Sequence, residues 1–373
     1  MIKRFIETQI DLFTPWIVHV IYGPRRSGKT TFVKHFLADK AKSLYVVGDD
    51  IMIQSLLGSK DLKKIQAWSS WYEYIVIDEA QYIPEVWYGL KILVDSNPEC
   101  IIIATWSSSF DLSQKIGEPL TWRKRTYTMF PLSASELITI YANRFAFAQD
   151  KEQYLVYGSY PALSAYTTLE AKRDYVHELI GSYLLKDILA LEHIKFSKTL
   201  FDLVKLLAFQ IGNEVSLNEL ANNLGISHIT VKKYIDLLVK SFVIVELSPY
   251  KDNRRKSISK MSKYFFLDLG VRNAVINNFN DLSTRDDCGE LRENYCIVEL
   301  MKKNIHLRTH QNFYFYRGYQ SGEVDLLIEE GNERRGFDCK RNAQKKPSLP
   351  KDLATLLTRV DALHPDNYLD YLL

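Results

Sequence analysis

The stretch GPRRSGKT, residues 23–30, constrains the fold of this chain more than any other feature. It matches the pattern G-x-x-x-x-G-K-[ST] without departure. The apolar run at 16–22 before it predicts a buried strand, and residues 31–39 after it predict a helix. A strand, a glycine-rich loop and a helix in this order predict an α/β fold whose loop binds nucleotide phosphates.

The chemistry of this loop follows from its residue types. Glycines let the backbone curl until its N–H groups point at the phosphates, and the Lys29 ammonium group reaches the β- and γ-phosphates. The Thr30 hydroxyl is a ligand for Mg²⁺. The sequence therefore predicts ATP and Mg²⁺ as cofactors, with a nucleotide-binding set of Gly23, Pro24, Arg25, Arg26, Ser27, Gly28, Lys29, Thr30 and Thr31.

A pair of carboxylates follows the next buried strand of this region. Residues 74–77 are apolar and end in Asp78 and Glu79. The carboxyl end of a parallel strand opens into the crevice where a nucleotide binds. We therefore expect Asp78 to hold Mg²⁺ and Glu79 to orient or deprotonate the attacking water.

Strand and helix patterns alternate through the first 132 residues. Short apolar runs at 16–22, 43–47, 74–77, 100–104 and 126–129 are separated by helical or polar stretches. Such alternation predicts a parallel sheet covered on both faces. We expect residues 1–132 to form a P-loop ATPase domain and residues 133–198 a helical connector.

Residues 199–270 carry a helix-turn-helix pattern followed by a strand. Ser216 predicts a helix start with Glu219 three residues on, and Gly225 predicts the turn before a helix that Ser227 caps. A basic loop at 251–256 follows, as in a winged helix. Exposed positions at the second helix permit DNA contact, namely His228, Thr230, Lys232 and Lys233. A structural or protein-binding module is the alternative.

Residues 271–373 carry a second set of chemical groups. Asp325 and Asp338 lie on neighbouring predicted strands with a turn between them, and Lys340 shares a strand face with Asp338. The two carboxylates, with Glu293 from a predicted helix, would hold Mg²⁺, and Lys340 would help activate water for phosphodiester attack. Ordinary surface charges on a solvated hairpin are the alternative.

Composition limits the classes of protein to which this chain can belong. The chain has 373 residues, which predicts two or three domains. Its 48 Lys and Arg against 45 Asp and Glu leave a net charge of +3, so a basic nucleic-acid surface would have to be local. Four cysteines without C-x-x-C spacing predict neither a disulfide framework nor a zinc site. With no membrane-length apolar run and a poor signal sequence, we expect a cytoplasmic protein.

In the order of its sequence blocks, the chain resembles the prokaryotic AAA-type ATPases whose C-terminal half is a domain of unknown function. That half resembles a winged helix followed by a PD-(D/E)XK nuclease-like fold. The resemblance covers nearly the whole chain and rests on GPRRSGKT, YIVIDEAQ, ATWSSSFDL, LTWRKRTYTMFPLSASEL, GSYPAL, TVKKYIDLLVKSFVI, SKYFFLDLG and GELRENYCIVEL…GEVDLLI…DCK.

The resemblance implies further residue roles. Thr105 or Ser107 would sense the γ-phosphate, and Arg123 would act as an arginine finger or trigger. The family commonly has glycine where Trp106 and Trp122 stand in this chain, beside these two positions. An arginine cluster at 123–125 also predicts an assembly of several copies, in which Arg123 or Arg125 reaches a neighbour's nucleotide.

Three functions agree with the sequence. The first is an Mg²⁺-dependent ATPase that acts on DNA or a macromolecular partner through winged-helix and nuclease-like modules. The second is an ATP-gated regulator that binds DNA without cutting it, with the C-terminal fold as a scaffold. The third is a nucleotide-switched protein-interaction module that binds no nucleic acid.

Overall fold

The structure is a computed structural model of the chain. It describes residues 2–107, 120, 122–181, 197–250, 261–318, 322–340, 344, 347, 357 and 359–373. The chain divides into two compact units. Unit 1 comprises Met1–Leu132 with Lys240–Phe242, and unit 2 comprises Ser133–Val239 with Val243–Leu373. Each unit is described by itself.

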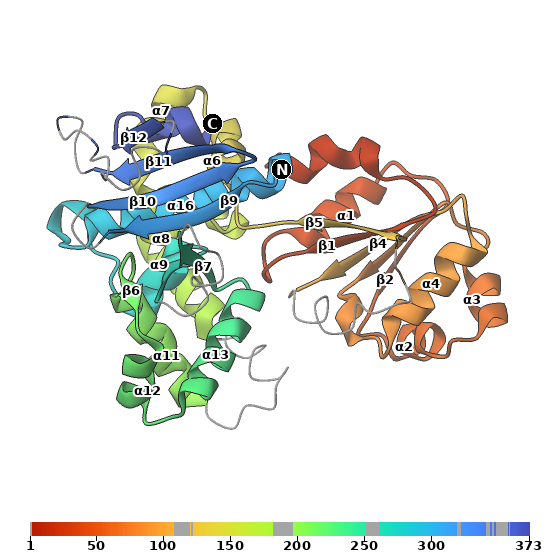
Figure 1. Ribbon diagram of the computed structural model, residues 1–373. Coiled ribbons are helices and arrows are strands. Elements are labelled where there is room, and N and C mark those ends of the chain that lie inside the picture. Colours follow the sequence, from red (N-terminus) through yellow and green to blue (C-terminus); the bar gives the residue numbers. More distant parts are fainter. Residues whose placement is uncertain are drawn as a thin grey trace. The chain divides into compact units, whose positions relative to one another are not determined.

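Unit 1 is built on a five-stranded parallel sheet (Figure 1). Its strand order is β2-β3-β4-β1-β5, so β1 lies inside the sheet, between β4 and β5. The carboxyl ends of all five strands therefore meet along one edge. The strands are β1 (Val18–Tyr22), β2 (Ser43–Val47), β3 (Tyr74–Asp78), β4 (Ile101–Trp106) and β5 (Lys124–Thr128).

Helices cover both faces of this sheet, as the alternation of strands and helices predicts (Figure 1). Alternate strand residues point to opposite faces. Ile75 and Ile77 pack with α2 (Ile51–Gly58), α3 (Leu62–Ser69) and α4 (Val86–Ser96), while Val76 packs with η1 (Phe5–Leu12) and α1 (Lys29–Leu37). A short η2 (Ala80–Tyr82) follows β3.

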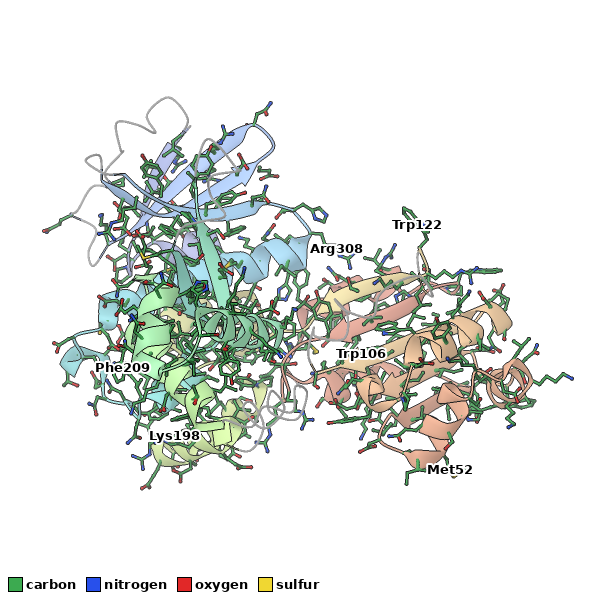
Figure 2. The ribbon with its side chains drawn as sticks, turned by 60° about the horizontal axis from the view of Figure 1, so that its bottom comes forward. Met52, Trp106, Trp122, Lys198, Phe209 and Arg308 are labelled. Carbon is green, nitrogen blue, oxygen red and sulfur yellow. The ribbon has the colours of Figure 1, made fainter. Side chains whose placement is uncertain are left out.

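The two tryptophans at positions where the sequence analysis expected glycine, Trp106 and Trp122, lie in opposite environments. The Trp106 indole is fully buried and stacks on Trp87 of α4, with ring centroids 4.7 Å apart and planes 7° from parallel. Trp122 is 94% exposed, and Figure 2 shows its side chain standing away from the strands. Trp106 is thus a core residue, whereas Trp122 is a surface residue.

Unit 2 begins with helices. Its N-terminal helical elements are α6 (Ala134–Leu137), η4 (Ile138–Ile140), α7 (Arg144–Asp150), α8 (Glu152–Tyr157), η5 (Pro161–Ala165) and α9 (Leu169–Leu179). Later ones are α11 (Ser197–Phe209), α12 (Leu217–Leu224), α13 (His228–Lys240), α15 (Leu269–Val275), η7 (Leu282–Thr284), α16 (Cys288–Leu307) and α17 (Tyr368–Leu372). None of the helices in the described part of the chain combines the length and apolar composition needed to cross a bilayer.

A seven-stranded sheet runs through unit 2 in the order β12-β11-β10-β9-β7-β8-β6. The hairpin β7–β8 joins the C-terminal strands because Ser248 and Pro249 of β7 pair in parallel with Tyr314 and Phe315 of β9. One sheet therefore connects the two segments that the sequence assigns to separate modules. The strands are β6 (Glu214–Val215), β7 (Ile244–Pro249), β8 (Ser262–Phe266), β9 (Asn312–Arg317), β10 (Glu323–Glu330), β11 (Glu333–Cys339) and β12 (Arg359–Leu363).

Local signals explain the helix pair α12–α13. The Ser216 hydroxyl accepts the Glu219 N–H at 3.3 Å and caps α12, and Gly225 ends the helix in a left-handed conformation with φ of 64°. The Ser227 hydroxyl then accepts the Thr230 N–H at 3.1 Å at the start of α13. The basic loop at 251–256 lies outside the described residues.

We expect the two tryptophans to contribute very differently to stability. Trp106→Ala leaves a cavity beside Trp87 and should lower the free energy of unfolding by about 3–5 kcal/mol. Trp122→Ala, the matched control, should change it by no more than about 0.5 kcal/mol. Urea unfolding followed by circular dichroism measures both, and equal losses would contradict the assignment of Trp106 to the core.

Candidate functional site

The loop between β1 and α1 has the close approaches that require glycine. A side chain at Gly23 would place its Cβ 2.1 Å from the Met129 carbonyl oxygen, and Gly28 has φ of 100° at the start of α1. Arg26 also adopts a positive φ, 60°. The first N–H groups of α1 have no acceptor within the helix and face this loop. The loop therefore has the backbone form of an anion cradle.

Lys29 is buried at the centre of this loop. Its ammonium group donates to the carbonyl oxygens of Gly23 at 2.8 Å and Pro24 at 2.9 Å. Burial lowers the pKa of Lys29 to about 8, although Glu79 and Asp78 raise it. The charge of Lys29 is therefore poorly solvated, and an anion bound in the loop would stabilise it.

Two further observations test whether the loop fits a phosphate group. Among the described residues, the Ser27 hydroxyl oxygen is buried and has no hydrogen-bond partner. Buried Arg4 donates to the Ser27 carbonyl oxygen and, at 2.6 Å, to the Phe130 carbonyl oxygen, so it fixes the back of the loop. An unsatisfied hydroxyl in a rigid loop of this shape fits a phosphate. The sequence analysis missed Arg4, whose only signal is a cation in a mainly apolar N-terminal segment.

Asp78 is the buried acceptor for three hydroxyl groups. Thr30 of α1 and Tyr45 of β2 each donate to its Oδ2 atom at 2.7 Å, and Thr105 of β4 donates to Oδ1. The predicted partners Thr30 and Asp78 are thus in direct contact, and together they offer the oxygen ligands that Mg²⁺ prefers. Tyr45 is a residue that the sequence analysis missed, because a tyrosine in an apolar strand looks like a core residue.

Glu79 follows Asp78 with a left-handed backbone, φ 52° and ψ 43°. Its N–H donates to the Thr105 hydroxyl at 2.9 Å, and its carboxylate accepts from the Gln81 amide. The same amide donates to the Ser107 hydroxyl at 2.9 Å. The structure therefore brings one candidate sensor, Thr105, to the Glu79 backbone and the other, Ser107, to the Gln81 amide that contacts the Glu79 carboxylate.

Trp106 does not disturb this arrangement. Thr105 and Trp106 are successive residues of β4, so their side chains point to opposite faces of the sheet. The indole packs in the core with Trp87, while the Thr105 hydroxyl contacts Asp78. The bulk of Trp106 is accommodated on the face that α4 covers.

The structure does not bring Arg123 to the loop of its own chain. Arg123 precedes β5 at the amino end of the sheet, and its carbonyl oxygen accepts the Val18 N–H at 2.9 Å. The phosphate loop follows Tyr22 at the opposite end of the neighbouring strand β1. The Arg123 guanidinium group pairs with Asp95 and is partly exposed. Within unit 1, Arg123 and Lys29 therefore lie at opposite edges of the sheet.

A second candidate site lies in unit 2, where an acidic cavity of about 330 Å³ opens beside α16. It contains all four residues that the sequence analysis selected in this region. The lining residues are Gly289, Glu290, Arg292, Glu293, Cys296, Glu323, Asp325, Asp338, Cys339, Lys340, Leu363, His364, Pro365 and Tyr368.

Strand pairing brings the two predicted aspartates together. Leu326 pairs with Phe337 in the antiparallel β10–β11 ladder, so Asp325 and Asp338, one residue further, face each other. Asp325 accepts the Cys339 N–H at 2.7 Å, and the Lys340 ammonium group lies 2.6 Å from Asp338. Lys340 thus pairs with Asp338 directly.

Lys263 of β8 is a functional candidate that the sequence analysis missed. Its ammonium group lies 2.8 Å from Glu323 and 3.3 Å from Glu293. Burial raises the pKa of Glu293, whereas the ammonium group of Lys263 lowers it. Burial also raises the pKa of Asp325 to about 6. The only indication of this role in the sequence is that Lys263 lies next to the aromatic run Tyr264–Phe266.

The side chains of the acidic cavity do not fit a divalent cation as they stand. Within the described ranges, no three His, Cys, Asp or Glu side chains are grouped so that they could hold a metal ion. Two lysine ammonium groups instead pair with Glu293, Glu323 and Asp338. The predicted metal set of Glu293, Asp325 and Asp338 therefore shares a cavity, and two of its members, Glu293 and Asp338, pair with lysines.

Three segments of the chain match known protein families. Residues 17–138 match an AAA domain, residues 148–282 match a domain of unknown function (DUF8612), and residues 288–370 match another (DUF4143). The parallel sheet, the glycine-rich loop and the first match together define unit 1 as an AAA-type P-loop ATPase domain.

Relatives extend over most of the chain. An uncharacterized protein of Mycobacterium tuberculosis is 25% identical over 344 residues, which cover 91% of this chain and 73% of the relative. An uncharacterized protein of Methanocaldococcus jannaschii is 26% identical over 350 residues, covering 88% and 75%. A Pyrococcus horikoshii STAND ATPase with a tetratricopeptide repeat sensor aligns at 14% identity with a TM-score of 0.29, over 81% of this chain and 46% of that protein's length.

The pKa of Lys29 leads to a pH-dependent prediction. Phosphates bind the charged ammonium group, which the free protein loses as pH rises through about 8. Above that pH, nucleotide binding must take up a proton, so affinity should fall by up to about tenfold per pH unit. Titration calorimetry with an ATP analogue from about pH 7 to about pH 9.5 measures this fall.

Lys29→Arg is the matched control, because its guanidinium group stays charged throughout this range. Its nucleotide affinity, though weaker, should not change with pH. A wild-type affinity that is also constant above pH 8 would contradict the lowered pKa of Lys29.

Proposed function

We propose that this protein binds and hydrolyses ATP with Mg²⁺ in unit 1 and uses the nucleotide cycle to act on DNA or a macromolecular partner through unit 2. The observation that carries the proposal is the contact between Thr30 and Asp78 beside the buried Lys29. A hydroxyl, a carboxylate and an ammonium group at the end of a glycine-rich loop are the groups that phosphoryl transfer requires.

The roles of the residues follow from their positions. The loop residues 23–31 would bind the phosphates, with Lys29 exchanging its carbonyl partners for phosphate oxygens. Thr30 and Asp78 would hold Mg²⁺, which neutralises phosphate charge when bound. Glu79 would orient or deprotonate the attacking water. Thr105, whose hydroxyl accepts the Glu79 N–H, would sense the γ-phosphate beside Glu79.

Arg123 supports a proposal about assembly. Because it lies at the sheet edge opposite the phosphate loop, it would reach a nucleotide only in a neighbouring copy. We therefore infer that a homo-oligomer supplies Arg123, or the nearby Arg125, in trans.

Unit 2 supplies the candidate effector. We infer that residues 199–270 act as a winged helix and residues 271–373 as a PD-(D/E)XK nuclease-like fold. Exposed His228, Ile229, Lys232 and Lys233 at the N-terminal part of α13 favour DNA as the partner. The paired lysines of the acidic cavity favour a scaffold that does not cut. Under this proposal unit 2 binds duplex DNA.

Two variants separate nucleotide binding from turnover. Lys29→Ala should weaken ATP binding about tenfold or more, because the phosphates lose their buried cation. Glu79→Gln should keep ATP binding while turnover falls about a hundredfold or more. Calorimetry and phosphate release measure the two effects. The control Glu99→Gln changes an exposed carboxylate at the other end of the sheet and should match wild type. Normal turnover in Glu79→Gln would remove Glu79 from the mechanism.

The DNA-binding proposal rests on α13 and is tested by salt dependence. Lys232→Ala with Lys233→Ala should weaken duplex binding and reduce the slope of log affinity against log salt by about one per lysine. Fluorescence anisotropy with a labelled duplex measures both quantities. Lys198→Ala on α11, another exposed lysine and one labelled in Figure 2, is the matched control. Failure of the wild-type protein to bind any duplex would favour a protein partner instead.

A further inference from the structure

Lys263 is a buried lysine that contacts Glu293 and Glu323, two carboxylates of the acidic cavity of unit 2. Only 3% of its side chain is exposed, although it belongs to the strand β8 of the β7–β8 hairpin. Its neighbours on β8, Tyr264 and Phe265, are buried apolar residues. A buried lysine is costly unless its charge is paired, so its partners identify its role.

The partners of Lys263 come from two other elements. Glu323 at the start of β10 lies 2.8 Å from its ammonium group, and Glu293 of α16 lies 3.3 Å away. The same group lies 5.4 Å from the centre of the Phe315 ring. Burial opposes the charge of Lys263, but Glu293 and Glu323 raise its pKa above its usual value. Lys263 therefore stays charged near neutral pH.

Two further carboxylates of the cavity, those of Asp325 and Asp338, are also engaged. Asp338 pairs with Lys340 at 2.6 Å, and Asp325 accepts the Cys339 N–H at 2.7 Å. A divalent cation that entered would have to compete with two ammonium groups for these oxygens. Like charges at such short range repel strongly in a poorly solvated cavity.

We propose that Lys263 is the resident cation of this cavity, and that its ammonium group takes the place of a divalent ion among Glu293, Glu323 and Asp325. The proposal is independent of nucleotide binding in unit 1. It also gives the β7–β8 hairpin a second attachment, because the ion pairs of Lys263 tie β8 to α16 and β10. Loss of the lysine would leave buried carboxylates without a counter-charge.

The test is calorimetric titration of the nucleotide-free, full-length protein with Mn²⁺. Lys263→Met keeps most of the length of the side chain but removes its charge, so it should gain one Mn²⁺ site that wild type lacks, and bind Mn²⁺ there about tenfold or more tightly than wild type does. The double variant Lys263→Met, Asp325→Asn should lose this gain, which would locate the ion in the cavity. Any binding in unit 1 is common to all proteins and cancels in the comparison.

Two controls keep the inference testable. Lys263→Arg preserves the positive charge and should bind no more Mn²⁺ than wild type. Asp325→Asn alone should also leave Mn²⁺ binding unchanged, because Lys263 already occupies the site. This variant leaves Lys263 intact, so it tests the proposal even if Lys263→Met does not fold. A wild-type Mn²⁺ site that Asp325→Asn removes would overturn the proposal. So would a folded Lys263→Met protein that gains no site.

Discussion

The buried carboxylate of Asp78 organises the catalytic edge of unit 1. It accepts three hydroxyl groups, and each comes from a different element: Thr30 from α1, Tyr45 from β2 and Thr105 from β4. An ionised carboxylate with little exposure needs such donors to offset its lost hydration. Because β3 lies between β2 and β4 in the sheet, this set of donors depends on the strand order. The helix α1, the loop and the adjacent Glu79 are positioned around the same group.

The carboxylates of unit 2 are satisfied in a different way. Hydroxyl donors stabilise Asp78 but carry no net charge, so they leave its negative charge available to a bound cation. Lysines pair with Glu293, Glu323 and Asp338, and a lysine cancels the charge of its partner. Hydroxyl groups therefore surround Asp78, whereas ammonium groups pair with Glu293, Glu323 and Asp338.

The pairing of β7 with β9 changes how unit 2 is understood. The sequence predicts two separate modules at residues 199–270 and 271–373, yet the strands of these two segments form one seven-stranded sheet. Lys263 adds a charged contact across the same junction. Shared backbone hydrogen bonds and buried ion pairs resist independent movement of the two segments. Residues 199–270 and 271–373 are therefore structurally coupled within unit 2.

The sequence by itself determined the elements and the chemistry of the phosphate loop. Local signals were sufficient there, because the glycines, Lys29 and Thr30 are adjacent in the chain and the flanking periodicities are strong. The AAA-type ATPase domain was predicted correctly in class. Asp78 and Glu79 could also be located, since a carboxylate that ends a buried strand faces the nucleotide edge of a parallel sheet.

Only the tertiary structure decided which distant side chains meet. The sequence did not identify Tyr45, Arg4 and Lys263 as site residues. Their partners are distant in the chain, so the contacts can be recognised only when the order of the strands is known. The separation of Arg123 from Lys29 likewise follows from strand direction, which places the two residues at opposite edges of one sheet. The sequence predicted that Glu293, Asp325 and Asp338 meet in one site, and they line one cavity, but only the tertiary structure placed Lys263 of β8 against Glu293 and Glu323.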